Sequence, residues 1–320
     1  MRIFVDIMNG KRSIGVVLTE GLLRLLGHLP LAFHHWMAGG LAWFLRSVVH
    51  YRSDVVMTNL SRSFPDKSYE EIRQIHKQFY RHLANIFTEM IWFGACRGEK
   101  GRKRLRKSHI VEMTNPEELN RLWNSSRQLM ILQSHSGNWE LIGGILNYSY
   151  GEQPEITSDT LAVTYLRAHS ALWDRVMADN RTAPVSDLNY PGYVEAGEAI
   201  RFALKRKAER YSYSFITDQF PYNENLHHSV RFMHQDTYTM TAAAALAVKL
   251  DMSVAYLRFE CREDGGYALT FVPLSDHAAG EDPMALTKAY YAHLEEDLEK
   301  QPWNYLWTHR RWKKYEKNPD

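Results

Sequence analysis

The alternation of short apolar runs with helical stretches after residue 127 constrains the fold of this chain more than any other feature. Short strands separated by helical patterns are typical of α/β proteins, in which helices cover both faces of one sheet. The predicted strands are 129–133, 161–165, 212–217, 253–260 and 267–273, and the predicted helices are 139–148, 170–180, 239–250 and 283–298. Because no linker rich in glycine, proline or serine divides the chain, we expect one α/β domain over residues 51–320 behind an N-terminal helical segment, residues 1–50.

The charge of the chain is small overall but unevenly spread. A formal net charge of +2 over 320 residues argues against a nucleic-acid-binding protein held by a broad basic field. Basic residues gather at 97–107, at 201–210 and at the C-terminal Arg310, Arg311, Lys313 and Lys314. Any one cluster suits a solvated face, whereas three together favour a docking surface for phosphates or an acidic partner.

The two cysteines, Cys96 and Cys261, lie far apart and lack the spacing of a zinc site. This usage fits a reducing compartment and predicts neither a disulfide framework nor a metal centre.

Two apolar-rich segments, 14–29 and 31–49, lie near the start of the chain, and charged residues or histidines interrupt both. Neither offers the roughly 18 uninterrupted apolar residues of a clean spanning helix, and no small-residue cleavage pattern marks a signal peptide. Trp36, Trp43 and Phe44 would suit amphipathic helices that lie in a membrane interface. A buried helical hairpin of a soluble protein and a single tilted span at 14–29 are the alternatives.

A histidine and a carboxylate follow the end of the first predicted strand. His135 lies just past that end, and Glu140 lies five positions later. A histidine oriented by a carboxylate can take a proton from a hydroxyl near neutral pH. Side chains five apart diverge by about 140° on a continuous helix, so cooperation requires His135 in a turn and Glu140 on the first turn of the next helix. Ser136, Gly137 and Asn138 suit such a turn and its N-cap.

Asp218 and Gln219 lie just past the carboxyl end of another predicted strand. Ligands of open α/β sheets bind outside the carboxyl ends of strands, so two polar landmarks there indicate a site. The sequence lacks Gly-x-Ser-x-Gly, His-Glu-x-x-His, Gly-x-Gly-x-x-Gly and P-loop motifs. We therefore expect no metal and no cofactor, and we interpret the histidine pairs at 34–35 and 227–228 as structural or surface residues.

The segment His135-Ser-Gly-Asn-Trp-Glu140 resembles the His-x4-Asp/Glu motif of glycerolipid acyltransferases. The wider pattern is closer to the bacterial late lipid A acyltransferases, often described as lysophospholipid acyltransferases, and the resemblance covers almost the whole chain. Its other landmarks are Tyr51-Arg52, Asn59-Leu60 and Phe64-Pro65, then Asp218-Gln219, the segment 232–247, and Pro302-Trp303-x-x-Leu306-Trp307-x-His309-Arg310-Arg311-Trp312-Lys313. Landmarks in this order are more specific than the motif alone.

Two positions depart from the family pattern. Met233-His234-Gln235-Asp236-Thr237 stands where a glycine usually precedes the Thr-rich helix, and Thr241 replaces a glycine often seen further along. These differences leave the acyl-chain length and the acceptor open, but not the reaction.

The resemblance implies a central mixed sheet and the transfer of a fatty acyl chain from a thioester to a hydroxyl of a lipid. His135 would be the general base on that hydroxyl, and Glu140 would hold its imidazole. Backbone N–H groups of the turn, or of the helix near Asn138, could support the oxyanion. Arg181 matches a family arginine expected near acceptor phosphates, unless it is a surface arginine at a helix end. Asp218 either orients the site or shapes a turn. The candidate substrate-binding residues are Asn138, Arg181, Asp218 and Gln219.

The resemblance also implies partners and a location. A lipid A precursor is the favoured acceptor, because its phosphates would suit the basic clusters, and acyl carrier protein is the favoured donor, because it is acidic. Since the acceptor stays in the bilayer, we expect the bacterial inner membrane, with the site on its cytoplasmic side. Alternatives are another lyso-lipid or aminolipid acceptor, with acyl-CoA as a possible donor, and a non-catalytic lipid-binding protein of the membrane surface.

Overall fold

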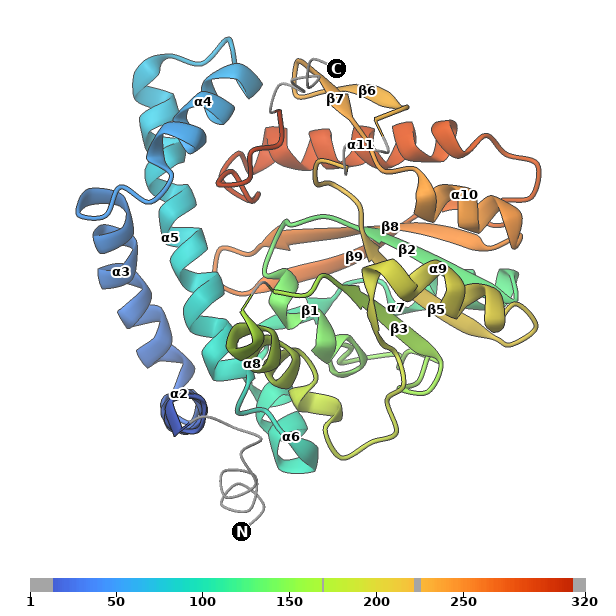
Figure 1. Ribbon diagram of the computed structural model, residues 1–320, viewed down its shortest axis with the longest axis horizontal. Helices are drawn as coiled ribbons and strands as arrows, with labels where there is room; N and C mark the ends of the chain where they lie inside the picture. Colours follow the sequence, from blue (N-terminus) through green and yellow to red (C-terminus); the bar gives the residue numbers. More distant parts are fainter. Residues whose placement is uncertain (1–13, 169, 222–225, 313–320) are drawn as a thin grey trace.

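Figure 1 shows the computed structural model, which describes residues 14–168, 170–221 and 226–312. The strands are β1 (Val111–Met113), β2 (Gln128–Gln133), β3 (Leu161–Tyr165), β4 (Tyr193–Glu195), β5 (Tyr211–Ile216), β6 (Ser229–Phe232), β7 (Gln235–Tyr238), β8 (Ser253–Cys261) and β9 (Tyr267–Ser275). The helices are α2 (Ile14–Gly27), α3 (Leu31–Ser47), α4 (Ser53–Ser63), α5 (Tyr69–Phe93), α6 (Gly98–Ser108), α7 (Pro116–Ser125), α8 (Ala171–Arg181), α9 (Ala196–Lys205), α10 (Ala242–Lys249) and α11 (Pro283–Lys300), with 3-10 helices η1 (Trp139–Asn147) and η2 (Ala183–Val185). Residues 1–13 of the predicted N-terminal segment, and Lys313 and Lys314 of the C-terminal cluster, lie outside the described residues.

One mixed sheet has the strand order β1-β9-β8-β2-β5-β3-β4, which confirms the predicted α/β class. Strands β8, β2, β5, β3 and β4 are parallel, whereas β9 runs antiparallel to β8 and pairs in parallel with β1. Strand β2 is central, since Leu129 pairs with Ser212 on one side and with Ser253 on the other. All residues of β2 are buried, which explains why its sequence is an apolar run rather than an alternation.

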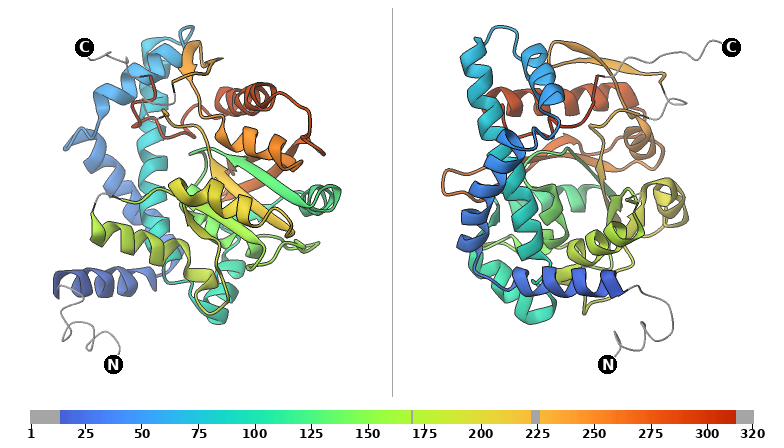
Figure 2. Two further views of the ribbon diagram at one scale, coloured as in Figure 1. Left: turned by 45° about the vertical axis from the view of Figure 1, so that its right-hand side comes forward. Right: turned by 60° about the vertical axis from the view of Figure 1, so that its left-hand side comes forward.

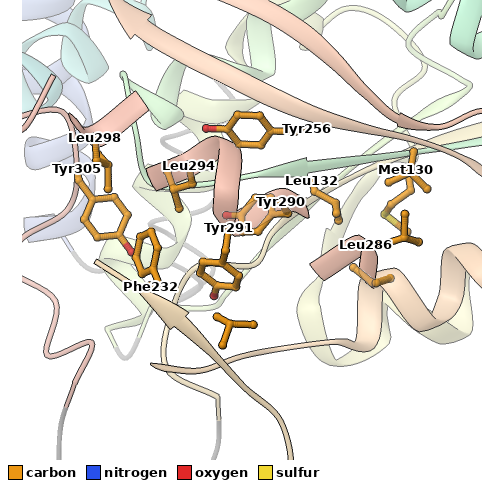
Figure 3. Close-up of a cluster of buried hydrophobic side chains, with 14 of the residues drawn as sticks. Met130, Leu132, Phe232, Tyr256, Leu286, Tyr290, Tyr291, Leu294, Leu298 and Tyr305 are labelled. Atoms are coloured by element: carbon orange, nitrogen blue, oxygen red, sulfur yellow. The ribbon is translucent and has the colours of Figure 1, made fainter. Parts of the chain in front are cut away.

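Helices cover both faces of this sheet (Figure 1). On one face, Met130 and Leu132 of β2 belong to a core shared with α9, α10 and α11, and Figure 3 shows them near Tyr290 of α11. On the other face, Leu129 and Ile131 belong to a core shared with α6, α7 and η1. Alternate residues of one strand therefore serve two cores.

The long helix α5 contributes to both cores. It begins with the predicted capping box, in which the Ser68 N–H donates to Glu71 Oε2 at 2.8 Å. Phe79, in the first half of α5, packs in one core, and Trp92 and Phe93, near its end, pack in the other. This helix therefore holds the two layers together.

The two predicted N-terminal helices are present as α2 and α3. Helix α3 packs along the outer side of α5, away from the sheet (Figures 1 and 2). Among the helices of the described residues, none is long and apolar enough to cross a membrane. The domain boundary at residue 50 stays a prediction.

The early landmarks of the sequence fasten the C-terminal segment. Arg52 Nη1 donates to the Thr308 carbonyl at 3.0 Å. Asn59 Nδ2 donates to the carbonyls of Trp307 and His309 at 2.9 and 3.0 Å. Residues about 250 positions apart are thus joined by hydrogen bonds, and the side chains of Arg52 and Asn59 stabilise the fold.

The β6–β7 turn lies where the family pattern usually has a glycine. Phe232 pairs with Gln235, so Met233 and His234 form a two-residue hairpin turn, with φ of 49° and 60°. Glycine and asparagine adopt such left-handed angles most readily. The departure from the family pattern therefore carries a backbone cost of about 1 kcal/mol per residue.

The other differences from the sequence-based expectations are local. The helix predicted at 139–148 is present as the 3-10 helix η1, and the helix predicted at 239–250 is shorter, as α10. Sequence patterns do not indicate β1 or β4, because strands of three residues carry too little periodicity.

Candidate active site

The ends of β2 and β5 bring His135 and Asp218 together, as the sequence predicts. Gln133 at the end of β2 pairs with Ile216 at the end of β5. Residues two positions beyond these partners therefore leave the same edge of the sheet side by side.

The Asp218 carboxylate holds the His135 ring. His135 Nδ1 donates to Asp218 Oδ1 at 2.7 Å, and the His135 backbone N–H donates to Oδ2 at 3.2 Å. Burial disfavours the charge of Asp218, but the His135 ring, its hydrogen bonds and nearby Arg311 outweigh burial and lower the pKa of the Asp218 carboxyl below its ordinary value. An ionised carboxylate only accepts hydrogen bonds. The neutral ring therefore carries its proton on Nδ1 and presents the Nε2 lone pair to the site.

Gln219 occupies that lone pair in this structure. Its Nε2 lies 3.0 Å from His135 Nε2, and both side chains are partly buried. A substrate hydroxyl that uses the same lone pair must displace the Gln219 amide.

The structure corrects the predicted contact between Glu140 and His135. Both Glu140 oxygens accept hydrogen bonds of 2.6 Å from Arg181, one from Nε and one from Nη2. Glu140 does lie on the first turn of the helix after the turn, as expected, but η1 directs it toward the end of α8. A Cβ at Gly143 would lie 1.8 Å from the Arg181 carbonyl, so this glycine permits the close approach of the two elements.

The Glu140–Arg181 pair is nearly enclosed, with side-chain exposures of 5% and 21%. Burial disfavours the Arg181 charge, but the carboxylate outweighs it and raises the pKa of the guanidinium above its ordinary value. Trp139 links this pair to the base: its Nε1 donates to Glu140 Oε1 at 3.1 Å, and its ring meets His135 edge-on at 5.0 Å between centroids.

The turn between His135 and η1 is tightly fastened. Gly137 has φ +59°, and a Cβ there would lie 2.4 Å from the Phe259 ring, so only glycine fits. Its N–H donates to Asn304 Oδ1 at 2.6 Å, and Asn138 caps η1 by accepting from the Glu140 N–H at 3.2 Å. With protein acceptors on the N–H groups of residues 135, 137 and 140, these three donors are not free to support an oxyanion.

The sequence analysis did not identify two residues that hold this turn, Glu89 of α5 and Asn304 of the C-terminal segment. Glu89 Oε2 accepts from Asn138 Nδ2 at 2.8 Å, and Asn304 holds Gly137. A signal was present for both: Glu89 is a lone acid in an apolar part of a helix, and Asn304 lies inside the C-terminal landmark.

An apolar cavity of about 230 Å³ adjoins Trp139 and Glu140. Helix α5 supplies much of its wall, and Tyr51, Arg52, α8 and the C-terminal segment supply most of the rest. The apolar lining residues are Leu83, Ile86, Phe87, Met90, Met177 and Leu306. Such a lining suits a hydrocarbon chain.

The basic clusters differ in what their side chains contact. In the α6 cluster, Arg102 pairs with Asp187 at 2.5 Å, and Arg104 and Arg106 donate to backbone carbonyls. Its exposed cations are Lys100, Lys103 and Lys107. The 201–210 cluster precedes β5 and so lies at the amino ends of the strands, opposite the site. Arg311 of the C-terminal cluster is 2% exposed and donates to Tyr291, so it is not a docking residue.

Across the part of the chain that the structure describes, no group of three or more histidine, cysteine or acidic side chains is arranged to hold a metal ion.

Comparisons with known proteins agree over nearly the whole chain. A family model described as "Bacterial lipid A biosynthesis acyltransferase" matches residues 8–314. The chain is 26% identical over 307 residues to the "Lipid A biosynthesis palmitoleoyltransferase" of Escherichia coli (strain K12), across 92% of this chain and 89% of the relative. The same values hold for the "Lipid A biosynthesis acyltransferase" of Shigella flexneri. The family match spans the helices before the sheet and every residue of the site.

Proposed function

Because the chain belongs to the bacterial lipid A biosynthesis acyltransferase family, we propose that it transfers a fatty acyl chain from acyl carrier protein to a hydroxyl of a lipid A precursor. The observation that carries the mechanism is the 2.7 Å hydrogen bond between His135 Nδ1 and Asp218. It leaves the opposite ring nitrogen as a base, close to an apolar cavity.

The proposed reaction is a direct transfer. The acceptor hydroxyl displaces Gln219 and donates its proton to His135 Nε2 as its oxygen attacks the thioester carbonyl carbon. The new ester C–O bond forms, the C–S bond breaks, and the imidazolium returns the proton to the thiolate that leaves. Asp218 stabilises the imidazolium throughout. No covalent acyl-enzyme is needed.

The other site residues have roles in binding. The apolar cavity would take part of the acyl chain, which places its thioester beside Trp139. Arg181 is our candidate for an acceptor phosphate. Its Nε and Nη2 donate to Glu140, whereas the one hydrogen bond of Nη1 within the described residues is a long one of 3.4 Å to the Tyr193 hydroxyl. Asn138 acts through the turn that it caps.

We also propose that the outer face of α2 and α3 contacts the inner membrane on its cytoplasmic side. Leu18, Leu22 and Leu25 of α2 are 67%, 56% and 70% exposed, and Trp36 and Trp43 of α3 are 74% and 58% exposed. Exposed leucines together with exposed tryptophans are typical of helices that lie in a membrane interface.

The double variant Trp36→Ala/Trp43→Ala tests this surface. We expect vesicles of phosphatidylethanolamine and phosphatidylglycerol to bind it at least about 10-fold more weakly, because each indole loses its apolar burial in the interface. Co-sedimentation with vesicles measures the change. Tyr69→Ala is the matched control, since Tyr69 is 71% exposed but lies outside this face, at the start of α5. Equal sedimentation of the double variant and the wild type would show that this face does not bind the membrane.

For acyl carrier protein we propose docking on the exposed lysines of α6. This helix packs on η1, where Arg106 Nη1 donates to the Asn147 carbonyl at 3.4 Å, so its charges lie on the layer that carries Glu140. The cluster at 201–210 lies at the opposite end of the strands. An acidic carrier protein bound at α6 would therefore deliver its acyl chain closer to His135 than one bound at the 201–210 cluster.

Charge reversal tests the docking site. In Lys100→Glu/Lys103→Glu/Lys107→Glu we expect KM for the acyl carrier protein thioester to rise about 10-fold at low salt, with kcat within about twofold, because long-range attraction is lost. Steady-state kinetics at two ionic strengths measure both terms. Lys205→Glu/Lys207→Glu is the control, because these exposed lysines belong to the far cluster. A KM that rises only in the control would place docking there instead.

The cellular experiment for the acceptor is mass spectrometry of lipid A from a bacterial strain that lacks this protein. The proposal expects lipid A short of one acyl chain. If lipid A keeps its full number of acyl chains while another lipid class lacks one, that other lipid is the acceptor and the proposal is wrong.

A further inference from the structure

Glu89 is a carboxylate that the proposed reaction does not use, yet it is fully buried in α5. Three donors from three different elements meet it at 2.8 Å. His35 Nε2 of α3 donates to Oε1, and Asn138 Nδ2 and the Tyr267 hydroxyl donate to Oε2. A buried carboxylate is costly unless such partners satisfy it, and a partly satisfied one is strongly destabilising. This arrangement therefore fixes all four groups relative to one another.

The contact with Asn138 sets the geometry of the catalytic turn. With its amide nitrogen donating to Glu89, Asn138 must present Oδ1 to the Glu140 N–H, which it caps at 3.2 Å. Gly137, the preceding residue, is held from the other side by Asn304. Glu89 thus holds the segment between the base and the Glu140–Arg181 pair.

The contact with His35 connects the same carboxylate to the helix that carries the exposed face. His35 lies next to Trp36, which is 74% exposed, while the His35 side chain is only 29% exposed and faces α5. The path from α3 to the turn is therefore two hydrogen bonds long, His35 to Glu89 and Asn138 to Glu89.

We propose that Glu89 is a positioning residue for acyl transfer, and that His35 couples the seating of α3 to the catalytic turn through it. The inference rests on the proposed function and adds its regulation: a change in how α3 sits on a lipid surface is transmitted to Asn138, and from there to His135 and Glu140. Small displacements of a catalytic group reduce the rate of the chemical step more than they reduce binding.

The experiment compares Glu89→Gln, His35→Leu and His35→Gln with the wild type, using full-length protein on phosphatidylethanolamine–phosphatidylglycerol vesicles that contain the acceptor. Glu89→Gln replaces one acceptor oxygen by a donor that faces other donors, and we expect kcat to fall about 100-fold with KM within about twofold. His35→Leu removes one donor, and we expect a fall of about 10-fold. His35→Gln keeps a donor and should restore kcat to within about threefold of the wild type.

Asp297→Asn is the matched control for the loss of a buried carboxylate. Asp297 is 4% exposed and paired with Tyr256 and Arg258, and it makes none of the hydrogen bonds that hold Gly137 and Asn138. Thermal unfolding is measured for every variant, and the ¹³Cε1 resonance of His135 reports the position of its ring without any turnover. The inference expects this resonance to shift in Glu89→Gln and His35→Leu, and not in Asp297→Asn or His35→Gln.

Two results would overturn the inference: a wild-type kcat in Glu89→Gln, or losses of kcat in Glu89→Gln and Asp297→Asn that follow their losses of Tm equally. A kcat of His35→Gln as low as that of His35→Leu would remove the coupling to α3. Failure of the proposed function looks different, because the wild type itself would then transfer no acyl chain, while the His135 resonance would still report whether Glu89 holds the turn.

Discussion

His135→Ala is expected to lower acyl transfer by about 10³-fold or more, because the acceptor hydroxyl then loses the general base that takes its proton. The structure makes this a specific expectation. The ring is held by Asp218 at 2.7 Å, and its other nitrogen, Nε2, contacts the displaceable amide of Gln219 at 3.0 Å. The measurement is the initial rate of product formation with purified protein at saturating thioester. A loss in kcat rather than in KM is expected, since the ring contributes mainly in the transition state.

Loss of the ring also leaves Asp218 without its partner, so the folded state needs its own check. Thermal unfolding and far-UV circular dichroism should show a folded His135→Ala protein with a lower Tm. His277→Ala is the control, since the His277 side chain is 60% exposed and lies beside residues 124–127, which precede β2 at the opposite end from the site. Equal rates for His135→Ala and the wild type would leave the non-catalytic alternative, a lipid-binding protein of the membrane surface.

Asp218→Asn is expected to lower kcat by about 10²- to 10⁴-fold with little change in the fold, because it reverses the histidine tautomer. The asparagine oxygen would accept from the His135 backbone N–H, so its amide nitrogen would donate to Nδ1 and leave the ring proton on Nε2. Asparagine lacks the negative charge of the wild-type carboxylate. Against the effect of burial, the His135 ring and Arg311 lower the pKa of that carboxyl, and its charge fixes the proton on Nδ1. Without that charge the imidazolium formed in the reaction is also less stable. Kinetics give the loss, and ¹⁵N resonances of His135 show which ring nitrogen carries the proton.

The same resonances distinguish Asp218 from Glu140 as the group that holds the base. Glu140→Gln breaks the bidentate pair with Arg181 and should leave the proton of His135 on Nδ1. Asp218→Asn should change it. A tautomer that responds to Glu140→Gln and not to Asp218→Asn would restore the pairing expected from the sequence motif.

The placement of the site could be predicted from sequence because it depends on strand ends. Strand β2 is largely apolar, β5 alternates aromatic residues with serines, and polar residues follow both. Because parallel strands end at one edge of a sheet, the sequence places His135 and Asp218 at the same edge, and the pairing of β2 with β5 makes them neighbours. The capping box at Ser68 and the turn at Gly137 were similarly local, since each depends on residues within a few positions.

The partners within the site could not be predicted in the same way. Glu140 follows His135 closely in sequence, yet its partner is Arg181, because the rotation of η1 and the close approach at Gly143 decide where the carboxylate points. The contact of Glu89 with Asn138 joins residues 49 positions apart. Such contacts depend on how layers pack, which periodicity along one segment does not encode.

The basic clusters show a related limit. The three clusters of basic residues cannot be distinguished in the sequence. In the structure, Arg102 pairs with Asp187 and Arg311 donates to Tyr291. The 201–210 cluster lies at the amino ends of the strands, opposite the site. The exposed lysines of α6 combine charge with a place on the layer that carries Glu140.

The most direct measurement is acyl transfer by the purified protein, with vesicles that hold a lipid A precursor and with acyl carrier protein or coenzyme A as the thioester. Mass spectrometry identifies the lipid that gains mass. The account predicts one added acyl chain on the lipid A precursor, faster with acyl carrier protein, and none with His135→Ala. Transfer to a different lipid, a preference for coenzyme A, or equal product from His135→Ala would contradict the acceptor, the donor or the base, respectively.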